Sequence, residues 1–282
     1  MAEIGFTEVS ATTQDLVSSI VQETLKERAK LMPLISDYSA LANKGTNTIK
    51  VPRRTQFAAA DKAENTNLTA QEITFAADTI DVSLHKAIYA KLEDFADFKS
   101  NVNVQAEIIQ EMANEVALQF DRDVITELKL ASTSAPDHLL DYVDTSGDAL
   151  ALADIANARA LLNRQNVPMA DRYMLISPER EQDLLNIDNF ISAEKYASRE
   201  ALVEGMVGRV FGFNVMVHTE LDAVDTIFWH RSAVGYGMGL NPSFEQDRDL
   251  ASASTEYLLQ NLYGVEVLDS GKRQVYINGA GA

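Results

Sequence analysis

Two groups of carboxylates are the residues of this chain best suited to chemistry by type and spacing. One group is Glu93, Asp94 and Asp97, and the other is Asp121 and Asp123. Paired acids can perform general acid–base catalysis in hydrolysis, or bind Mg²⁺ through their oxygens. Because the whole chain is acidic, a solvated surface is the simpler interpretation of both groups. A Mg²⁺-dependent soluble α/β enzyme that uses the four aspartates is kept as a remote alternative.

The four histidines offer little support for a metal site. They are His85, His138, His218 and His230, and no two of them have the HxxxH spacing of helical metal ligands. Surface exposure or core packing is the expectation for each. His218 and His230 could approach each other only if the strands that carry them are adjacent.

Glycines cluster at two places without forming a nucleotide-binding motif. The segment GYGMG at 235–239 is not GxGxxG and lacks the βαβ context that gives that motif meaning. Gly208 and Gly212 precede the apolar segment NVMVH, which indicates a tight loop before a strand, with a phosphate cradle as the alternative. The chain contains neither a GxSxG elbow nor a Walker loop. We therefore expect no catalytic, cofactor or metal site.

Composition and charge describe an acidic globular chain. It has 282 residues, of which 46% are hydrophobic and 23% are charged, as in ordinary globular proteins. This length is enough for one elaborate domain or two modest ones. The net charge of −18 argues against a protein that grips DNA phosphates through basic side chains. A container whose acidic inner wall repels DNA fits this charge, and so does simple solubility. The absence of cysteine excludes thiol catalysis, Cys-based zinc sites and disulfides.

Neither a leader nor a membrane segment is expected. Residues 1–13 lack a basic segment followed by an apolar stretch, and no apolar run approaches the roughly 20 residues that span a bilayer.

The strongest periodic signal is a long amphipathic helix over residues 101–130. Its apolar side chains recur at spacings of three and four: Ile108, Ile109, Met112, Val116, Phe120, Val124 and Leu128. The length corresponds to about seven to eight turns, which suits a rigid strut. A second amphipathic helix is predicted over residues 14–32.

Between these helices the pattern predicts a long β-hairpin. Residues 46–54 alternate as a strand with an edge proline, residues 58–71 are small and polar, and residues 73–92 form a long strand-like run. The polar tip has almost nothing large and apolar to pack on its own domain, and an isolated hairpin is only marginally stable. We therefore expect the hairpin to contact a neighbouring subunit.

After residue 148 the elements are short and alternate in type. Helices are predicted at 149–165 and at 177–186, where Ser177 would be the N-cap and Pro178 the first helical residue. Strands and one glycine-rich loop or strand are predicted at 172–176, 207–211, 214–218, 226–229, 233–239, 255–268 and 272–278.

The order of these elements resembles the major capsid proteins of tailed bacteriophages, which have the Hong Kong 97 phage coat fold. The local matches are VGRVFGFNVMVHTEL (207–221), FWHRSAVGYGMG (228–239) and YGVEVLDSGKRQVYINGA (263–280). Each motif is degenerate, and the order and spacing over nearly the whole chain carry the resemblance. It implies an α+β fold in four parts. They are an N-terminal arm (1–45), an extended-loop hairpin (46–92), a peripheral domain with the long spine helix (93–140 and 240–282) and an axial α/β domain (141–239).

The resemblance also implies a function without catalysis. Many copies would self-assemble into hexamers and pentamers of an icosahedral shell that encloses double-stranded DNA without sequence-specific binding. The protein would reside in the virion and assemble in the host bacterial cytoplasm with a portal. Many relatives carry a cleaved N-terminal scaffolding segment; because the chain begins close to the arm, either a separate scaffolding protein is expected or such a segment precedes the residues of this sequence. An encapsulin-like bacterial nanocompartment shares the fold and remains the main alternative.

Five residues of the hairpin are the expected assembly contacts. Arg53 and Arg54 are adjacent cations that could pair with carboxylates of a neighbouring subunit, or could simply be solvated. Lys62, Glu64 and Glu72 lie near the tip. Some relatives crosslink a lysine of this loop to an asparagine of a neighbour, but the surroundings of Lys62 match no such site, so that chemistry is not expected here.

Overall fold

The computed structural model describes most of the folded body of the chain. The described residues are 25, 29–42, 47–53, 59, 61, 62, 64, 67, 70, 71, 76–94, 104–130, 150–186 and 208–277. Nearly all of the helix predicted at 14–32 lies outside them. The chain contains both helices and strands, and most of the described strand pairs are antiparallel, so the α+β prediction is confirmed. None of the helices in these ranges is long and apolar enough to span a bilayer.

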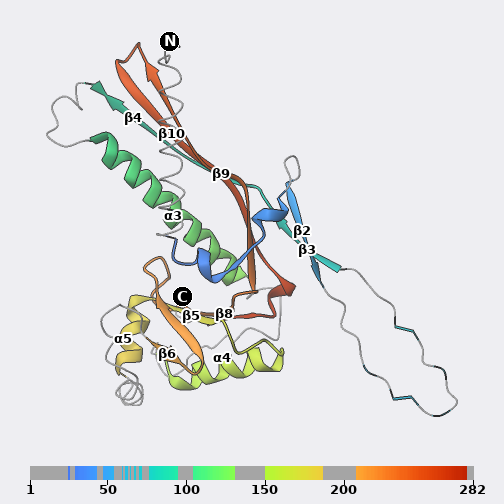
Figure 1. The fold of residues 1–282 in the computed structure, drawn as a ribbon. Helices are drawn as coiled ribbons and strands as arrows, with labels where there is room; N and C mark the ends of the chain where they lie inside the picture. Colours follow the sequence, from blue (N-terminus) through green and yellow to red (C-terminus); the bar gives the residue numbers. More distant parts are fainter. Residues whose placement is uncertain are drawn as a thin grey trace, which may run out of the picture.

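A four-stranded sheet and one long helix form the larger unit. Strands β9 (Val234–Asp249) and β10 (Ser254–Val267) form a long antiparallel hairpin. β4 (Leu84–Glu93) pairs with β10, and β1 (Ser36–Asp37) pairs in parallel with β9. Helix α3 (Val104–Leu130) runs along this sheet (Figure 1). The 27-residue helix confirms the predicted strut.

The apolar stripe of α3 forms the core between helix and sheet. Its central and C-terminal members are buried, and Phe120 is completely buried. The Phe120 ring lies 5.5 Å from the ring of Tyr236 on β9 and 5.3 Å from that of Tyr263 on β10, measured between centroids. These edge-on and tilted contacts are the favoured arrangements of aromatic pairs. Ile108 and Ile109, nearer the start of the helix, are only partly buried.

A five-stranded sheet forms the second unit. Its strands in spatial order are β11 (Gln274–Ile277), β8 (Thr226–His230), β5 (Arg172–Ile176), β7 (Phe213–Val217) and β6 (Arg209–Val210). Only β5 and β7 pair in parallel. Helices α4 (Leu152–Arg164) and α5 (Pro178–Asn186) share a hydrophobic cluster with one face of this sheet. Side chains such as Trp229 on the other face join the cluster around α3.

Local capping explains where α5 begins. The Ser177 Oγ accepts a hydrogen bond from the backbone N–H of Arg180 (3.2 Å), and Pro178 is the first helical residue. An N-cap hydroxyl satisfies an amide that has no partner within the helix, and proline lacks the amide that would otherwise need one. The predicted N-cap and first residue are both confirmed.

The predicted hairpin exists, but its second arm is shorter than predicted. β2 (Thr48–Arg53) pairs with β3 (Ala76–Asp81) in a separate two-stranded sheet. The run 73–92 was predicted as one strand, and this is wrong: the chain breaks at Val82–Ser83 and continues as β4 in the four-stranded sheet. The alternation of burial continues across the break, with Ile80 and Val82 both buried. The sequence period therefore did not reveal that the pairing partner changes.

The glycine-rich segment 233–239 is the beginning of β9, which extends ten residues beyond it. Glycine is required where backbones approach closely. A Cβ at Gly264 on β10 would lie 2.2 Å from the carbonyl oxygen of Asp81, and one at Gly237 would lie 2.2 Å from the Ile49 Cδ1. These two positions let the hairpin of β2 and β3 pack directly on the β9–β10 pair.

Candidate assembly surfaces

An ion-pair cluster fixes the outer end of the β2–β3 pair, from which the chain continues into residues 54–75. Arg53 on β2 donates to Asp78 on β3, and its Nε lies 3.5 Å from a carboxylate oxygen of Asp269, in the turn after β10. The Asp78 carboxylate also accepts a hydrogen bond from the backbone N–H of Asp269 (3.0 Å). Two carboxylates of its own chain thus engage Arg53, which orients the hairpin on the body. A contact of Arg53 with a neighbouring subunit stays a prediction.

The hairpin has an apolar base and an exposed outer part. Ile49, Ile80, Val82 and Leu268 form a small buried cluster where β2 and β3 meet the body. β2 and β3 project from the side of the four-stranded sheet (Figure 1). The described residues beyond them are all exposed: Ala59, Asp61, Lys62, Glu64, Asn67, Ala70 and Gln71.

The predicted contact residues therefore lie at two levels of one arm. Arg53 is at the outer end of the paired strands, held by its own chain, while Lys62 and Glu64 are exposed further along. Arg54 and Glu72 lie outside the described residues. The structure brings none of the described three into contact with another.

Asp121, one of the suspected catalytic acids, is a buried structural acceptor. It is 1% exposed and accepts hydrogen bonds from the backbone N–H groups of Lys30 (3.0 Å) and Leu31 (3.1 Å). The Nε2 of buried His218 lies 3.2 Å from the same carboxylate, and its Nδ1 accepts a hydrogen bond from the backbone N–H of Glu220. This network assigns the proton to Nε2. Asp121 thereby joins the N-terminal segment, α3 and the end of β7.

Asp123 connects α3 to two strands. Its carboxylate accepts hydrogen bonds from the Tyr263 hydroxyl on β10 (2.6 Å) and from Gln119 (2.9 Å). The ammonium of Lys86 on β4 lies 3.1 Å away. Burial, followed by the hydrogen bond to Asp123, raises the pKa of Tyr263 well above its usual range. Asp123 is therefore a structural acceptor that fixes the helix on the sheet.

The four suspected aspartates do not converge on one site. Asp94 pairs with Arg248 near the tip of the β9–β10 hairpin (3.0 Å), whereas Asp121 and Asp123 have the separate partners described above. Asp97 lies outside the described residues. In the ranges that the structure describes, no group of three or more histidine, aspartate or glutamate side chains could hold a metal ion.

The two histidines of the second sheet do not lie on adjacent strands. β7 and β8 flank β5 on opposite sides. His218 contacts Asp121, whereas the Nδ1 of His230 lies 2.8 Å from the Ser232 hydroxyl. The sequence pattern did not predict that the strands that lead to His218 and His230 are separated by β5, because strand order depends on pairings between distant segments.

A carboxylate cluster that the sequence analysis missed lies where α3 meets β10. Burial, and then the nearby charges of Glu266 and Asp123, raise the pKa of Glu127 from 4.5 to about 7. Burial and the charge of Asp81 also raise the pKa of Glu266. Like charges close together in a partly desolvated place favour the protonated form of one of them. This junction therefore changes its charge near neutral pH.

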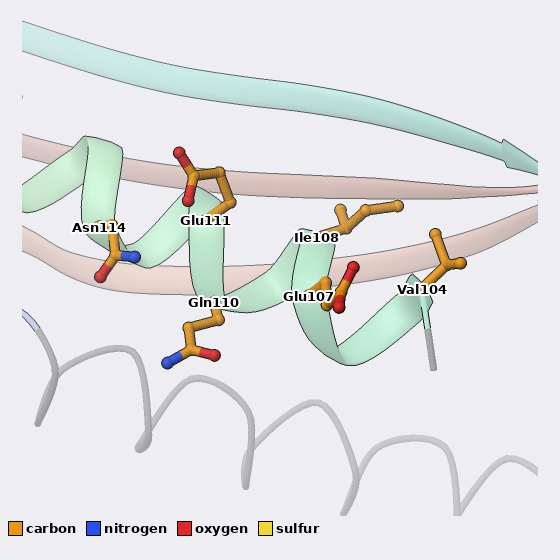
Figure 2. Close-up of a pocket in the computed structure, with 6 residues that line it drawn as sticks. All are labelled: Val104, Glu107, Ile108, Gln110, Glu111 and Asn114. Carbon is orange, nitrogen blue, oxygen red and sulfur yellow. The ribbon is translucent and has the colours of Figure 1, made fainter. Parts of the chain in front are cut away.

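The first turns of α3 border an open groove (Figure 2). It is lined by Val104, Glu107, Ile108, Gln110, Glu111 and Asn114. In Figure 2 the carboxylate of Glu107 lies near the apolar side chain of Ile108, and that of Glu111 extends from the next turn of the helix. An open groove along one helix, with exposed carboxylates, resembles a protein contact surface more than an enclosed substrate pocket.

These features define a class of protein. Three of the four suspected acids, Asp94, Asp121 and Asp123, join secondary structure elements, and a projecting hairpin extends from a helix-and-sheet body. Such a chain is an architectural subunit. A family model described as phage capsid protein matches residues 39–261. The chain belongs to this family, and it is a structural subunit of a viral capsid.

Solved structures of phage and virus-like particles share the fold. A chain from Mycobacterium phage Che8 is 20% identical, with a TM-score of 0.68 over 88% of this chain and 90% of that one. A chain of the capsid of cyanophage P-SCSP1u is 17% identical, with a TM-score of 0.70 over 88% and 87%. A virus-like particle from Pyrococcus furiosus is 12% identical, with a TM-score of 0.60 over 94% and 99%. The likeness supports the Hong Kong 97 phage coat fold that the resemblance implied. No curated protein sequence matches the chain.

Proposed function

We propose that copies of this chain form hexameric and pentameric capsomers of an icosahedral shell that encloses double-stranded DNA. The observation that carries the proposal is the β2–β3 hairpin, whose base is packed while its described outer residues are exposed. Ordering such an arm costs conformational entropy that its own contacts do not offset. A surface on a neighbouring subunit would supply the missing contacts, and family membership makes that neighbour another copy.

Within this proposal the hairpin residues have distinct roles. Lys62 and Glu64 contact the neighbour directly, and Arg54 and Glu72 are further contacts. Arg53 sets the direction of the arm through Asp78 and Asp269, and a neighbour's carboxylate is a further partner.

The proposed division into domains follows the hydrophobic clusters. The cluster around α3 and the four-stranded sheet supports a peripheral domain built from residues 93–140 and 240–282, although side chains of the axial range such as Trp229 and Tyr236 also belong to it. The cluster beneath the five-stranded sheet supports an axial domain at 141–239, although β11 contributes to it from outside that range. The arm (1–45) and the hairpin (46–92) complete the proposal.

The enclosed DNA and the remaining partners are also part of the proposal. A net charge of −18 suits a wall that must not adhere to packaged DNA. A separate scaffolding protein, a portal and assembly in the host bacterial cytoplasm complete this picture.

Assembly of the expressed chain, alone and with a scaffolding protein, tests the proposal. Sedimentation and electron microscopy should show capsomers, tubes or closed shells. A species that stays monomeric at high concentration in both cases would contradict it. The double exchange Lys62→Glu and Glu64→Lys keeps composition and net charge, so it is a matched variant. It should lower the assembled fraction without changing the thermal unfolding of the subunit.

A further inference from the structure

One end of the five-stranded sheet carries exposed positive charge. β5 and β7 are parallel, with Tyr173 opposite Asn214, so the turns that precede both strands lie at the same end. β8 ends there and β11 begins there, because Arg172 is opposite His230 and Gln274 is opposite Trp229. We call the exposed basic residues of this end the cationic edge: Arg164, Arg209, Arg231 and Lys272.

The charge of the cationic edge is not neutralised by the described part of its own chain. None of its four side chains forms an ion pair with a described residue. The carboxylate of Asp269 is engaged by Arg53 and Arg273, and the exposed acids near Arg231 are Asp171 and Asp37, neither of which forms an ion pair with it. The edge therefore stands out on a chain whose net charge is −18.

A buried arginine shapes the turn behind this edge. Arg172 is 2% exposed and donates hydrogen bonds to the backbone carbonyls of Pro168 (2.8 Å) and Val167 (2.6 Å) and to the Asn163 side chain (2.9 Å). Burial, with the nearby charge of Arg159, lowers its pKa from the usual value. Since these three acceptors are neutral, Arg172 adds to the positive potential of the edge while fixing the turn before β5.

Two apolar side chains are displayed between these cations. Met169, in the turn before β5, is 58% exposed, and Phe211, in the turn before β7, is 42% exposed. Phe211 has φ +46° and Gly212 has φ +91°. Two consecutive left-handed residues make a turn that favours Asn, Asp or Gly, so a bulky phenylalanine in the first position is strained. Backbone strain that is retained at an exposed aromatic residue suggests that the side chain has a functional role, such as contact with a partner.

We propose that the cationic edge, with Met169 and Phe211 between its cations, docks on a carboxylate-rich surface of a second copy of this chain. The proposal rests on the shell assembly proposed above. An interface core of Phe and Met with arginine around it is typical of protein partners. Binding of nucleic acid phosphates would need only the cations. Acidic copies repel one another, and a cationic surface that meets a neighbour's carboxylates converts that repulsion into attraction and orients the contact.

Charge reversal at the edge tests the docking. Arg209→Glu with Arg231→Glu changes the net charge from −18 to −22, since each reversal subtracts two. Lys30→Glu, at an exposed residue away from the edge and outside the hairpin, changes the charge by the same two units as Arg231→Glu alone and is the matched control for that single variant. At moderate salt, the edge variant should lower the fraction sedimenting as particles about tenfold, whereas the control stays within about twofold of the unmodified chain.

Phe211→Asn separates docking from folding. Asparagine suits the left-handed position better than phenylalanine, so the thermal unfolding temperature of the subunit should stay equal or rise. The assembled fraction should nevertheless fall, because the exposed aromatic ring is lost. A residue with a merely structural role would change both quantities in the same direction.

Three results would overturn the inference. Edge and Phe211→Asn variants that assemble as well as the control would show that the surface is not used. Variants that form normal particles but lose co-purifying nucleic acid, seen in the ratio of absorbance at 260 and 280 nm, would identify a nucleic-acid surface instead. Failure of the unmodified chain to assemble would remove the proposed function and this inference with it.

Discussion

Glu127→Gln tests the carboxylate cluster at the junction of α3 and β10. The pKa of Glu127 is raised from 4.5 to about 7, first by burial and then by Glu266 and Asp123. Below pH 4.5 the carboxyl is protonated in both the folded and the unfolded chain, so it costs nothing. Between 4.5 and about 7 the folded state becomes less stable as pH rises, and above about 7 the full cost is present.

The magnitude follows from the size of this rise. A difference of about 2.5 in pKa corresponds to roughly 3–4 kcal/mol, at about 1.4 kcal/mol for each unit. Glu127 is only partly buried, so solvent screening reduces this to about 1–2 kcal/mol. Glutamine has the same size without the charge. The substitution should therefore raise the free energy of unfolding by about 1–2 kcal/mol at pH 8 and change it little near pH 4.5.

Urea unfolding of the subunit, followed by circular dichroism at the two pH values, measures this difference. Glu107→Gln, at an exposed position of the same helix, is the matched control and should change stability little at either pH. Equal effects of Glu127→Gln at both pH values, or destabilisation at pH 8, would refute the electrostatic reasoning.

Substitutions at four further positions test the packing of the body. Phe120→Ala should lower the free energy of unfolding by about 3–5 kcal/mol, because the residue is fully buried among aromatic rings; urea denaturation measures this, and a loss below about 1 kcal/mol would contradict it. Asp121→Ala should cost about 2–4 kcal/mol in the same assay, because two buried amides lose their acceptor, and Asp121→Asn should restore part of the loss. Gly264→Ala should abolish soluble expression, since its Cβ would meet the Asp81 backbone at 2.2 Å, whereas Gly212→Ala, with open space around it, should cost only about 1 kcal/mol. Soluble folded Gly264→Ala protein would show that the β2–β3 hairpin is packed differently.

Periodicity and capping residues predicted the elements whose signals lie close together in the sequence. The stripe that contains Phe120 and Val124 predicted α3, and the Ser177–Pro178 pair predicted the start of α5. In both cases the signal lies within a few residues along the chain, because helical packing and capping are local.

The candidate site was harder to predict because its contacts join distant segments. The carboxylates of Asp121 and Asp123 suggested catalysis by their spacing. The structure instead joins Asp121 to the Leu31 amide, 90 residues away, and Asp123 to the Tyr263 hydroxyl, 140 residues away on β10. Glu127 gave no signal, since its raised pKa depends on Glu266 of another strand. No local pattern contains that information.

The sequence alone determined that this chain has a long amphipathic helix, a polar-tipped hairpin and an acidic surface, because period, composition and charge are properties of the chain itself. Only the tertiary structure decided that the run 73–92 divides between two sheets, that Arg53 is engaged by two carboxylates of its own chain, and that four cations gather at one sheet end. The physical reason is common to all three. A strand's partner and a side chain's neighbours are selected by packing between segments far apart in sequence, where one pattern of alternation fits several pairings equally well.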